Sequence, residues 1–467
     1  MPETGKTNVI FILTDDQGPW ALGCAGNPEI RTPNLDRLAA RGMRFSDFFC
    51  TSPVCSPSRA SLMTGRIPSQ HGVHDWIRGG NLAPGAIGYL DGLKCYPEVL
   101  AGNGWHCGFS GKWHLGDSVR PQGGFDHWFV HQKGGGQYND APMIRDGKLV
   151  DEPGYVTDVI TDDALAFLDR NASRPFYLSV HYTAPHSPWT GHPQEIVDSY
   201  DDCPFESCPQ EPRHPWARGL TDNCLGNREM LKGYFAAVTA MDRNVGRIMD
   251  RVEKLGLSER TLIVFTSDNG FSCGHHGFWG KGNGTNPLNM YENSVKVPLI
   301  LSHPGRIAEG AVTDAMASGY DFMPTLVEYL GLPPLGDETL PGSSFAAVLD
   351  GQKQEGREEV VVFDEYGPVR MIRTRGWKYV ERHADGRGGG AGETELYDLV
   401  DDPGERENLA AEDSHAERIS EMQGRLREWF GRYVDAGRDG WGQPVDGAGQ
   451  MTMVSVPPEA TAFFRAE

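Results

Sequence analysis

Three short, uninterrupted apolar runs constrain the fold of this 467-residue chain more than any other feature. They are rich in β-branched and aromatic residues and cover residues 8–14, 175–182 and 261–267. Strands that are apolar on both faces are typical of the buried centre of a parallel sheet, which helices cover on either side. Each run ends in polar residues, and in open α/β sheets the site forms along the edge where parallel strands end. The sequence therefore predicts an α/β fold with its site at that edge.

Amphipathic helices are predicted between these strands. The longest covers residues 231–255, where apolar residues recur every three or four positions. Shorter helices are expected over 34–41 and 158–170. Residues 186–228 have no clear period, contain many Pro, Trp and Cys residues, and follow a strand that ends at the predicted site. Loops of this length are usually functional or disordered, and we expect this one to form a wall of a substrate pocket.

The character of the sequence changes near residue 356. Short strands are predicted over 360–363, 369–374 and 377–380, and a glycine-rich hairpin over 386–392. A helix that starts at Ser414 carries an apolar face made of Ile419, Met422, Leu426 and Phe430. We therefore predict a catalytic domain over 1–355 and a C-terminal domain of antiparallel sheet and helix over 356–467, whose last thirty residues are a docked tail or partly disordered.

The charge balance disfavours several classes of partner. The chain has 64 acidic and 43 basic residues and a net charge of −21, whereas nucleic acids select basic surfaces. No segment approaches the roughly 20 apolar residues that span a bilayer, and the N-terminus has no signal-peptide pattern. We expect a cytoplasmic protein that binds neither nucleic acid nor membrane. If a signal peptide has been removed, a periplasmic or secreted protein is expected instead.

The cysteines do not indicate a metal or disulfide framework. They are nine in number and include no C-x-x-C pair, so a zinc site is not predicted. Most are expected to be small, buried apolar residues. Cys203, Cys208 and Cys224 lie in one loop-like region, and pairing among them is left open.

Residues 55–65, with the sequence CSPSRASLMTG, carry the strongest functional signal. Ser56 can cap the start of a helix that ends at Gly65. Cys55 then precedes a helix N-terminus, where the backbone favours negative charge. Arg59 lies one turn into the helix and can reach the same anion. The alternative is an ordinary capped helix preceded by a buried cysteine.

This segment resembles the signature of the type I sulfatases, C-x-P-x-R followed by T-G. Other blocks typical of that family occur in the family's order: TDDQG at 14–18, GKWHLG at 111–116, APHSP at 184–188, SDNG at 267–270, HHG at 275–277 with the residues up to 298, and ELYDL at 395–399 with the residues up to 409. The resemblance implies the alkaline phosphatase-like fold, with a large, mostly parallel sheet flanked by helices. It also implies that a formylglycine-generating enzyme converts Cys55 to formylglycine, an aldehyde that hydrates to a gem-diol.

A metal site is predicted where two of the strands end. Asp15, Asp16, Asp268 and Asn269 follow these strands and offer oxygen ligands. Hard cations such as Ca²⁺ and Mg²⁺ prefer oxygen, and Ca²⁺ tolerates a crowded, irregular arrangement better. The resemblance implies that these four residues, with an oxygen of modified residue 55, hold one Ca²⁺. An Asp-Asp pair alone would more often be a solvated turn.

The resemblance assigns the remaining catalytic roles to Arg59, Lys112, His114, His186 and Lys281. One hydroxyl of residue 55 attacks sulfur, while the cations stabilise the sulfuryl oxygens. His186, with Lys281 as a second candidate, donates a proton to the leaving alcohol. His114 takes a proton from the second hydroxyl, which expels sulfate. The metal and the basic side chains would attract a monoanionic sulfate ester to an otherwise acidic chain.

We therefore predict a sulfatase that cleaves a sulfate monoester of a small sulfated mono- or oligosaccharide, with residues 71–78 and 186–228 lining a polar, aromatic pocket. A second interpretation is a phosphate- or phosphonate-ester hydrolase of the same superfamily. Asn269 weighs against it, because several of those enzymes carry His at the matching position. A third is a non-catalytic module that binds sulfated sugars, but every residue type expected in the site is present.

Overall fold

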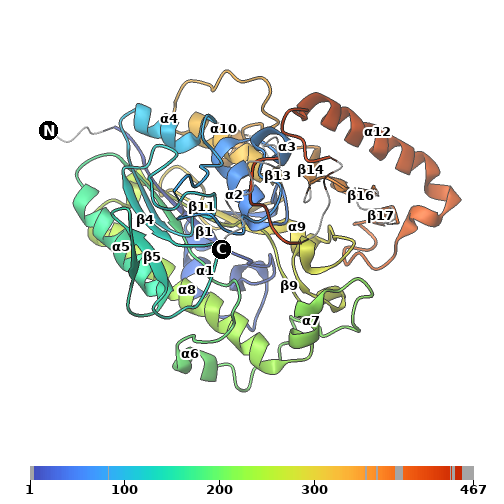
Figure 1. Ribbon diagram of the computed structural model, residues 1–467, viewed down its shortest axis with the longest axis horizontal. Coiled ribbons are helices and arrows are strands. Elements are labelled where there is room, and N and C mark those ends of the chain that lie inside the picture. The colour runs from blue at the N-terminus through green and yellow to red at the C-terminus, as the bar shows by residue number, and fades with distance from the viewer. Residues whose placement is uncertain are drawn as a thin grey trace.

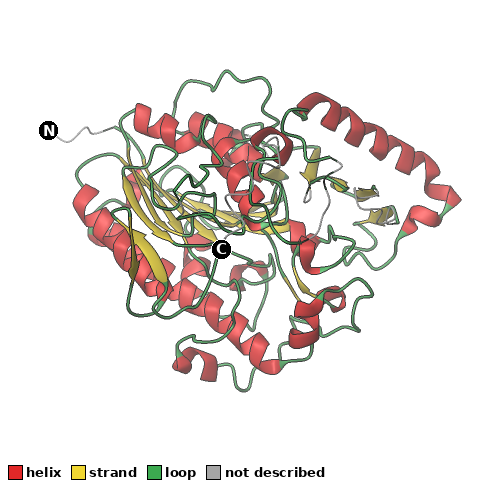
Figure 2. Ribbon diagram, viewed as in Figure 1, coloured by secondary structure: helices red, strands yellow, loops and turns green. Residues whose placement is uncertain are grey.

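The computed structural model describes residues 5–82, 84–352, 355–363, 366–383, 393–441, 443 and 447–454. A large sheet lies between two layers of helices, and a smaller sheet with one long helix lies beside it (Figures 1 and 2). The glycine-rich hairpin predicted over 386–392 lies outside the described residues. Among the described residues, no helix has the length and apolar character needed to cross a membrane.

The large sheet is parallel at its centre and mixed at its flanks, where antiparallel pairs occur on both sides and β12 and β13 pair in parallel with β2. Its strand order is β12–β2–β11–β8–β1–β7–β3–β4–β5–β6, with β13 beside β2. The strands from β8 to β4 run parallel, whereas β11 and β5 run antiparallel to their neighbours. The strands are β1 (Asn8–Thr14), β2 (Met43–Phe49), β3 (His106–Gly111), β4 (His127–His131), β5 (Pro142–Arg145), β6 (Lys148–Asp151), β7 (Phe176–His181), β8 (Thr261–Ser267), β11 (Lys296–Ser302), β12 (Ala311–Thr313) and β13 (Ala317–Ser318). The predicted mixed, mostly parallel α/β sheet is confirmed.

Strand β1 divides the apolar core into two parts. Val9, Phe11 and Leu13 belong to one buried cluster, and Ile10 and Ile12 belong to the other. Helices α2, α4 and α10 contribute to the first cluster, and α1, α5 and α8 to the second (Figure 1). Because both faces of β1 are buried, its residues from Val9 to Leu13 are all apolar rather than alternately apolar and polar.

The predicted helices over 34–41, 158–170 and 231–255 are confirmed to within a few residues. The helices are α1 (Pro33–Ala40), α2 (Cys55–Thr64), α3 (Pro68–His71), α4 (Tyr96–Gly102), α5 (Val156–Asn171), α6 (Gln194–Asp198), α7 (Gly219–Cys224), α8 (Arg228–Lys254), α9 (Glu292–Val295), α10 (Gly319–Tyr329), α11 (Ala346–Leu349) and α12 (Ala416–Tyr433). The segment 186–228, expected to be a loop, contains the two short helices α6 and α7. Cys203, Cys208 and Cys224 in this segment are free thiols, so none of them pairs with another.

The smaller sheet is antiparallel and packs against α12. Its strands are β14 (Glu359–Phe363), β15 (Val369–Thr374), β16 (Trp377–Arg382) and β17 (Glu395–Asp398). Met422, Leu426 and Phe430 of α12 are buried against this sheet, as the apolar face predicts. Lys378 of β16 connects the smaller sheet to the large one. Its fully buried ammonium lies 2.8 Å from a carboxylate oxygen of Glu292, which belongs to α9, directly before β11 of the large sheet. The domain boundary at 355 stays a prediction.

Candidate active site

The ends of β1 and β8 bring three carboxylates together. The two strands are parallel and in register, with Thr14 opposite Ser267, so the residues that follow them emerge side by side. The backbone amide of Asp16 donates to Oδ1 of Asp268 over 3.3 Å. One carboxylate oxygen from each of Asp15, Asp16 and Asp268 lies within 4.8 Å of the other two. The predicted convergence of distant strand ends is confirmed.

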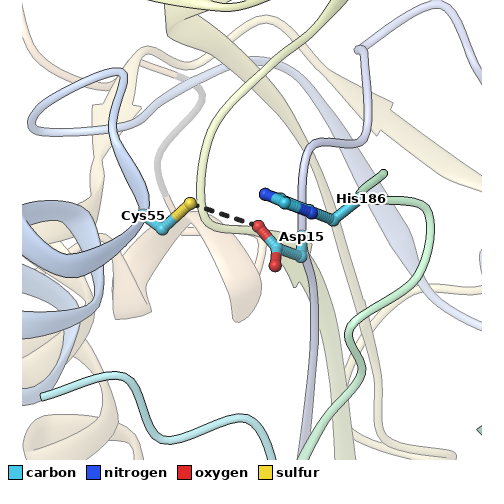
Figure 3. A group of neighbouring side chains, drawn as sticks. All are labelled: Asp15, Cys55 and His186. Carbon is cyan, nitrogen blue, oxygen red and sulfur yellow. Dashed lines mark hydrogen bonds between the residues drawn. The ribbon is translucent and has the colours of Figure 1, made fainter. Parts of the chain in front are cut away.

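Cys55 faces these carboxylates from the first residue of α2. Its Sγ lies 3.4 Å from Oδ1 of Asp15, and the imidazole of His186 lies beside the pair (Figure 3). The prediction that Ser56 caps the helix is wrong: the cap position is Val54, and Cys55 is already helical. The Ser56 hydroxyl is instead used in tertiary structure, because it donates to the carbonyl oxygen of His114 over 2.8 Å. This bond holds the first turn of α2 against the site.

Each carboxylate is paired with a buried basic side chain. Nε of Arg59 donates to Oδ2 of Asp268 over 2.8 Å. Lys112, which follows β3, donates to Asp15, and Lys281 donates to Oδ1 of Asp16 over 2.5 Å. All six side chains are at least nine-tenths buried. The site therefore concentrates charge in a low-dielectric environment, where electrostatic effects are strong.

Burial and charge together set the protonation states around Cys55. Burial, with the charges of Asp15 and Asp268, raises the pKa of the Cys55 thiol to about 12. Burial also opposes ionisation of Asp15, but nearby cations, first among them Lys112, hold the pKa of that carboxyl well below its usual range. Burial and the charge of Asp15 raise the pKa of Asp268 to about 6. An unmodified Cys55 is thus a neutral thiol and a poor nucleophile.

Two histidines in the site differ in accessibility and hydrogen bonding. Nε2 of His114 donates to the carbonyl oxygen of Ile77 over 2.9 Å, which places its lone pair on Nδ1, a buried atom without a partner among the described residues. Burial, then Lys112 and Arg59, hold the pKa of His114 well below its usual value, so the ring is neutral. His186 is 27% exposed, and its Nε2 lies 3.7 Å from Oδ2 of Asp16.

The donor set fits a hard cation. The three converging side chains of Asp15, Asp16 and Asp268 supply only oxygen. Asn269 donates through Nδ2 to Oδ1 of Asp16 over 2.7 Å, while its own Oδ1 is buried and has no hydrogen-bond donor among the described residues. A buried amide oxygen without a donor is costly unless another positive group satisfies it. Three converging carboxylates with a buried amide oxygen close by match the preference of hard cations such as Ca²⁺ and Mg²⁺ for oxygen.

A cavity of about 640 Å³ leads to these residues. Cys55, Asp16, His114, His186 and Lys281 are among its lining residues. Residues from several other segments also line it: Trp76, Ile77, Arg78, Lys133, Gly134, Trp189, Arg218, Leu220 and Gly447. The cavity thus combines buried ionic groups with aromatic and basic side chains.

A family model described as Sulfatase matches residues 7–332. The chain belongs to the type I sulfatase family. It is therefore a sulfuric ester hydrolase, and the predicted family and enzyme class are confirmed. A second family model, described as N-sulphoglucosamine sulphohydrolase, C-terminal, matches residues 274–430 and so includes the smaller sheet.

Individual relatives support the same conclusion. The sulfatase is 28% identical to an N-acetylglucosamine-6-O-sulfatase of Bacteroides thetaiotaomicron, and the match covers 93% of this chain and 88% of the relative. It is 31% identical to arylsulfatase A of Homo sapiens, over 86% of this chain and 83% of the relative. A solved structure described as a complex with its substrate D-glucosamine-2-N,6-O-disulfate is similar with a TM-score of 0.78 and 26% identity, and covers 93% of this chain and 99% of that one.

The predicted pocket wall of the sulfatase needs one correction. Of residues 71–78, only Trp76, Ile77 and Arg78 line the cavity. His71 is buried, with its Nε2 3.0 Å from the hydroxyl of Ser61, and Nε2 of His74 donates to the carbonyl oxygen of Arg438 over 2.7 Å. These hydrogen bonds hold both histidine side chains away from the cavity, so neither of them lines it. Residues of the segment 186–228, such as Trp189 and Arg218, do line the cavity, and their contact with substrate stays a prediction.

Sequence reasoning missed Lys133 and Gly134 of the sulfatase. They follow β4, another parallel strand that ends at the site edge, in the run Lys-Gly-Gly-Gly. A Cβ added to Gly134 would lie 2.2 Å from ring atoms of His114, so only glycine fits beside that imidazole. A glycine run directly after a central strand was the available signal.

Proposed function

We propose that this sulfatase cleaves a sulfate monoester on a mono- or short oligosaccharide, with formylglycine made from Cys55 as nucleophile and one Ca²⁺ as cofactor. The observation that carries the proposal is the convergence of Cys55 with the carboxylates of Asp15, Asp16 and Asp268 at the inner end of one cavity. The sugar substrate is supported by the cavity's aromatic and basic lining and by the names of the relatives, which act on amino-sugar sulfates.

The state of Cys55 supports its conversion. A thiol whose pKa lies near 12 supplies almost no thiolate at neutral pH, so the cysteine itself is unsuited to attack sulfur. Formylglycine at this position would provide a hydrated aldehyde, whose hydroxyl is the nucleophile. Because Cys55 is only 3% exposed, we expect the formylglycine-generating enzyme to act before the chain has folded.

Asp15, Asp16, Asp268 and Asn269, together with residue 55, would hold the metal. Bound Ca²⁺ would polarise a sulfuryl oxygen and lower the cost of the charge that develops there. Arg59, Lys112 and Lys281 surround the same point and would hold the remaining negative charge of the sulfate.

The two histidines suit opposite proton transfers. Neutral His114 has its lone pair on Nδ1 and can accept a proton. Nδ1 of His186 lies 2.7 Å from the carbonyl oxygen of Ser187 and must donate to it, so Nε2 is the nitrogen left for the leaving alcohol. In the imidazolium form of the ring, Nε2 carries the proton that would pass to that alcohol, and the ring returns to the neutral Nδ1–H form. Lys281 is the weaker candidate for that step, because Asp16 and other negative groups outweigh burial and raise its pKa well above the usual value. It is expected to stay a cation throughout.

Hydrolysis assays on paired substrates test the proposal. We expect release of sulfate from 4-nitrophenyl sulfate and from N-acetylglucosamine 6-sulfate, and far slower hydrolysis of 4-nitrophenyl phosphate. Activity should be lost with a chelator and recover with Ca²⁺, and Cys55→Ala should be inactive although folded. The mass of the peptide that spans residue 55 should correspond to the aldehyde. Faster hydrolysis of the phosphate would overturn the proposal in favour of a phosphate or phosphonate ester hydrolase, and activity on the aryl sulfate alone would remove the carbohydrate assignment.

A further inference from the structure

Three basic side chains in the more exposed part of the cavity lining have no acidic partner among the described residues. They are Arg78, Lys133 and Arg218. Among the described residues, no carboxylate lies within ion-pair distance of any of them, whereas nearby surface arginines are paired, such as Arg213 with Asp222 at 2.7 Å. Three unpaired cations around one opening are a local exception in a chain whose net charge is −21.

The three residues come from separate segments, each fixed through its backbone. The amide of Arg78 donates to the carbonyl oxygen of Gln450 over 3.1 Å, and that of Arg218 donates to Gly284 over 2.9 Å. The amide of Lys133 donates to Nδ1 of His131 over 3.1 Å. The positions of these cations around the cavity are therefore set by the fold, while their side chains stay available to a ligand.

The inner site does not need these charges. The carboxylate of Asp16 lies 2.5 Å from the ammonium of Lys281, and no other Asp or Glu is found among the described lining residues. The scissile sulfate has its own cations deeper in the site, among them Arg59 and Lys112. Trp76 and Trp189 line the same cavity and add aromatic surface to it.

We propose that Arg78, Lys133 and Arg218, the rim cations, form a second anion subsite. It would bind a sulfate or a carboxylate that the substrate carries in addition to the scissile sulfate, on the same sugar ring or on the next one. This inference rests on the proposed action on sulfated carbohydrates and narrows it to substrates with at least two anionic groups. Basic groups that surround a cavity with low-dielectric walls attract such substrates and orient them.

The test compares sugars that differ in one anionic group. The probes are N-acetylglucosamine 6-sulfate, glucosamine 2-N,6-O-disulfate, and N-acetylglucosamine 6-sulfate linked to a uronic acid. In the triple variant R78Q/K133Q/R218Q, KM for a preferred two-anion sugar should rise about tenfold or more, because each exposed ion pair contributes up to roughly fivefold. The rise for the one-anion sugar should be several times smaller, and kcat should change little for either. Added salt should raise KM for the two-anion sugar more in the parent enzyme than in the variant.

Lys148→Gln is the matched control, because Lys148 is an exposed cation of β6 that does not line the cavity. It should leave the ratio of the two KM values unchanged. A preference for the disulfate assigns sulfate to the subsite, and a preference for the uronate assigns carboxylate. Equal effects of the triple substitution on all three sugars, or no effect, would overturn the subsite.

Equilibrium binding separates this inference from the proposed function. Cys55→Ala cannot form formylglycine, so its affinity for each sugar is measured without turnover. If no sugar is hydrolysed by the parent enzyme, the proposed carbohydrate function fails. The subsite is still tested, because Cys55→Ala should bind a two-anion sugar more tightly than the one-anion sugar, and adding the triple substitution should abolish that difference.

Discussion

At the scale of single residues, the surroundings of His114 and His186 differ in a way that suits the two side chains to opposite proton transfers. Both line the same cavity, but His114 is buried and bonded through Nε2 to a carbonyl, whereas His186 is partly exposed and bonded through Nδ1. His114 also has a backbone φ of 58°, in a region that a non-glycine residue rarely adopts. Asp16 shares this conformation with a φ of 63°. Such strain is concentrated at functional sites, where the surrounding structure maintains it.

The role of His186 as proton donor predicts a dependence on the leaving group. His186→Gln should lower kcat by roughly 10²–10⁴ for a sugar sulfate, whose alcohol must be protonated as it leaves. The loss should be much smaller for 4-nitrophenyl sulfate, because nitrophenolate leaves without a proton. Measuring kcat across aryl sulfates of graded phenol pKa would reveal a steeper dependence in the variant. His214→Gln, outside the cavity lining, serves as the control. A uniform loss across all leaving groups would contradict the assignment.

Individual site residues were predictable where a pattern placed them at a strand end. Asp15 and Asp268 follow apolar strands, so their convergence could be inferred from the sequence. The cap expected at Ser56 was wrong because its hydroxyl bonds to a carbonyl 58 residues away, a contact that local sequence does not encode. Arg218 could not be assigned to the cavity from the sequence, because nothing local distinguishes it from other surface cations, whereas the glycine run after β4 was a usable signal for Lys133.

At the scale of elements, the C-terminal segment 447–454 supports one wall of the cavity. Gln450 is almost fully buried, and its Oε1 accepts from the amides of His74 and Asp75 over 2.7 and 3.2 Å. Its Nε2 donates to the carbonyl oxygen of Gly72 over 2.8 Å. One side chain therefore fixes the loop that carries Trp76 and Arg78. The predicted docked tail is confirmed for this segment.

Gln450→Ala should loosen this wall without touching the inner site. Removing the side chain leaves buried amides without acceptors, at about 1–3 kcal/mol, so the thermal midpoint should fall. KM for a sugar sulfate should rise more than KM for 4-nitrophenyl sulfate, while kcat on the aryl ester is retained. Gln443→Ala, at an exposed position in the same region, is the control for stability and kinetics. Unchanged stability, or an equal loss on both substrates, would show that the segment does not support the wall.

The helices and strands that are most deeply buried were the easiest to locate from the sequence. Strands β1, β7 and β8 are mostly apolar and buried along their whole length, because helices cover both faces, which made them the clearest signals. Strands β12 and β13 are only three and two residues long and gave no pattern. The helices α6 and α7 are also short, and the proline-rich sequence around them concealed them.

At the scale of the whole molecule, many histidines are buried in neutral form. Burial lowers the pKa of His74, His131, His192 and His275 to about 4 and that of His276 to about 3. In the unfolded chain a histidine takes up a proton near pH 6.5. Since the folded pKa is depressed, the stability from each group is complete above pH 6.5 and declines as the pH falls towards 4. Buried carboxyls with raised pKa values act oppositely but are fewer.

Acid should therefore destabilise the fold well before most carboxylates titrate. Each buried histidine contributes a loss of about 1.4 kcal/mol per pH unit below 6.5. Calorimetry at pH 7.5, 6.5 and 5.5 should show a nearly constant thermal midpoint over the first interval and a clear fall over the second. His192→Gln should reduce the size of that fall relative to the parent protein. A midpoint that rises between pH 6.5 and 5.5 would be inconsistent with neutral buried histidines.

The position of β1 also governs when activity can arise during synthesis. This strand is made before the other strands of the sheet, yet it pairs with β7 at Tyr177 and with β8 at Thr261, which are made much later. Contacts between such distant segments form slowly, because long loops must close before they form. Asp15 meets Asp268 only when this last pairing is complete. Recovery of catalysis during refolding should thus coincide with closure of the sheet centre, and a nascent chain that has not yet reached β8 has a complete Cys55 segment but no working site.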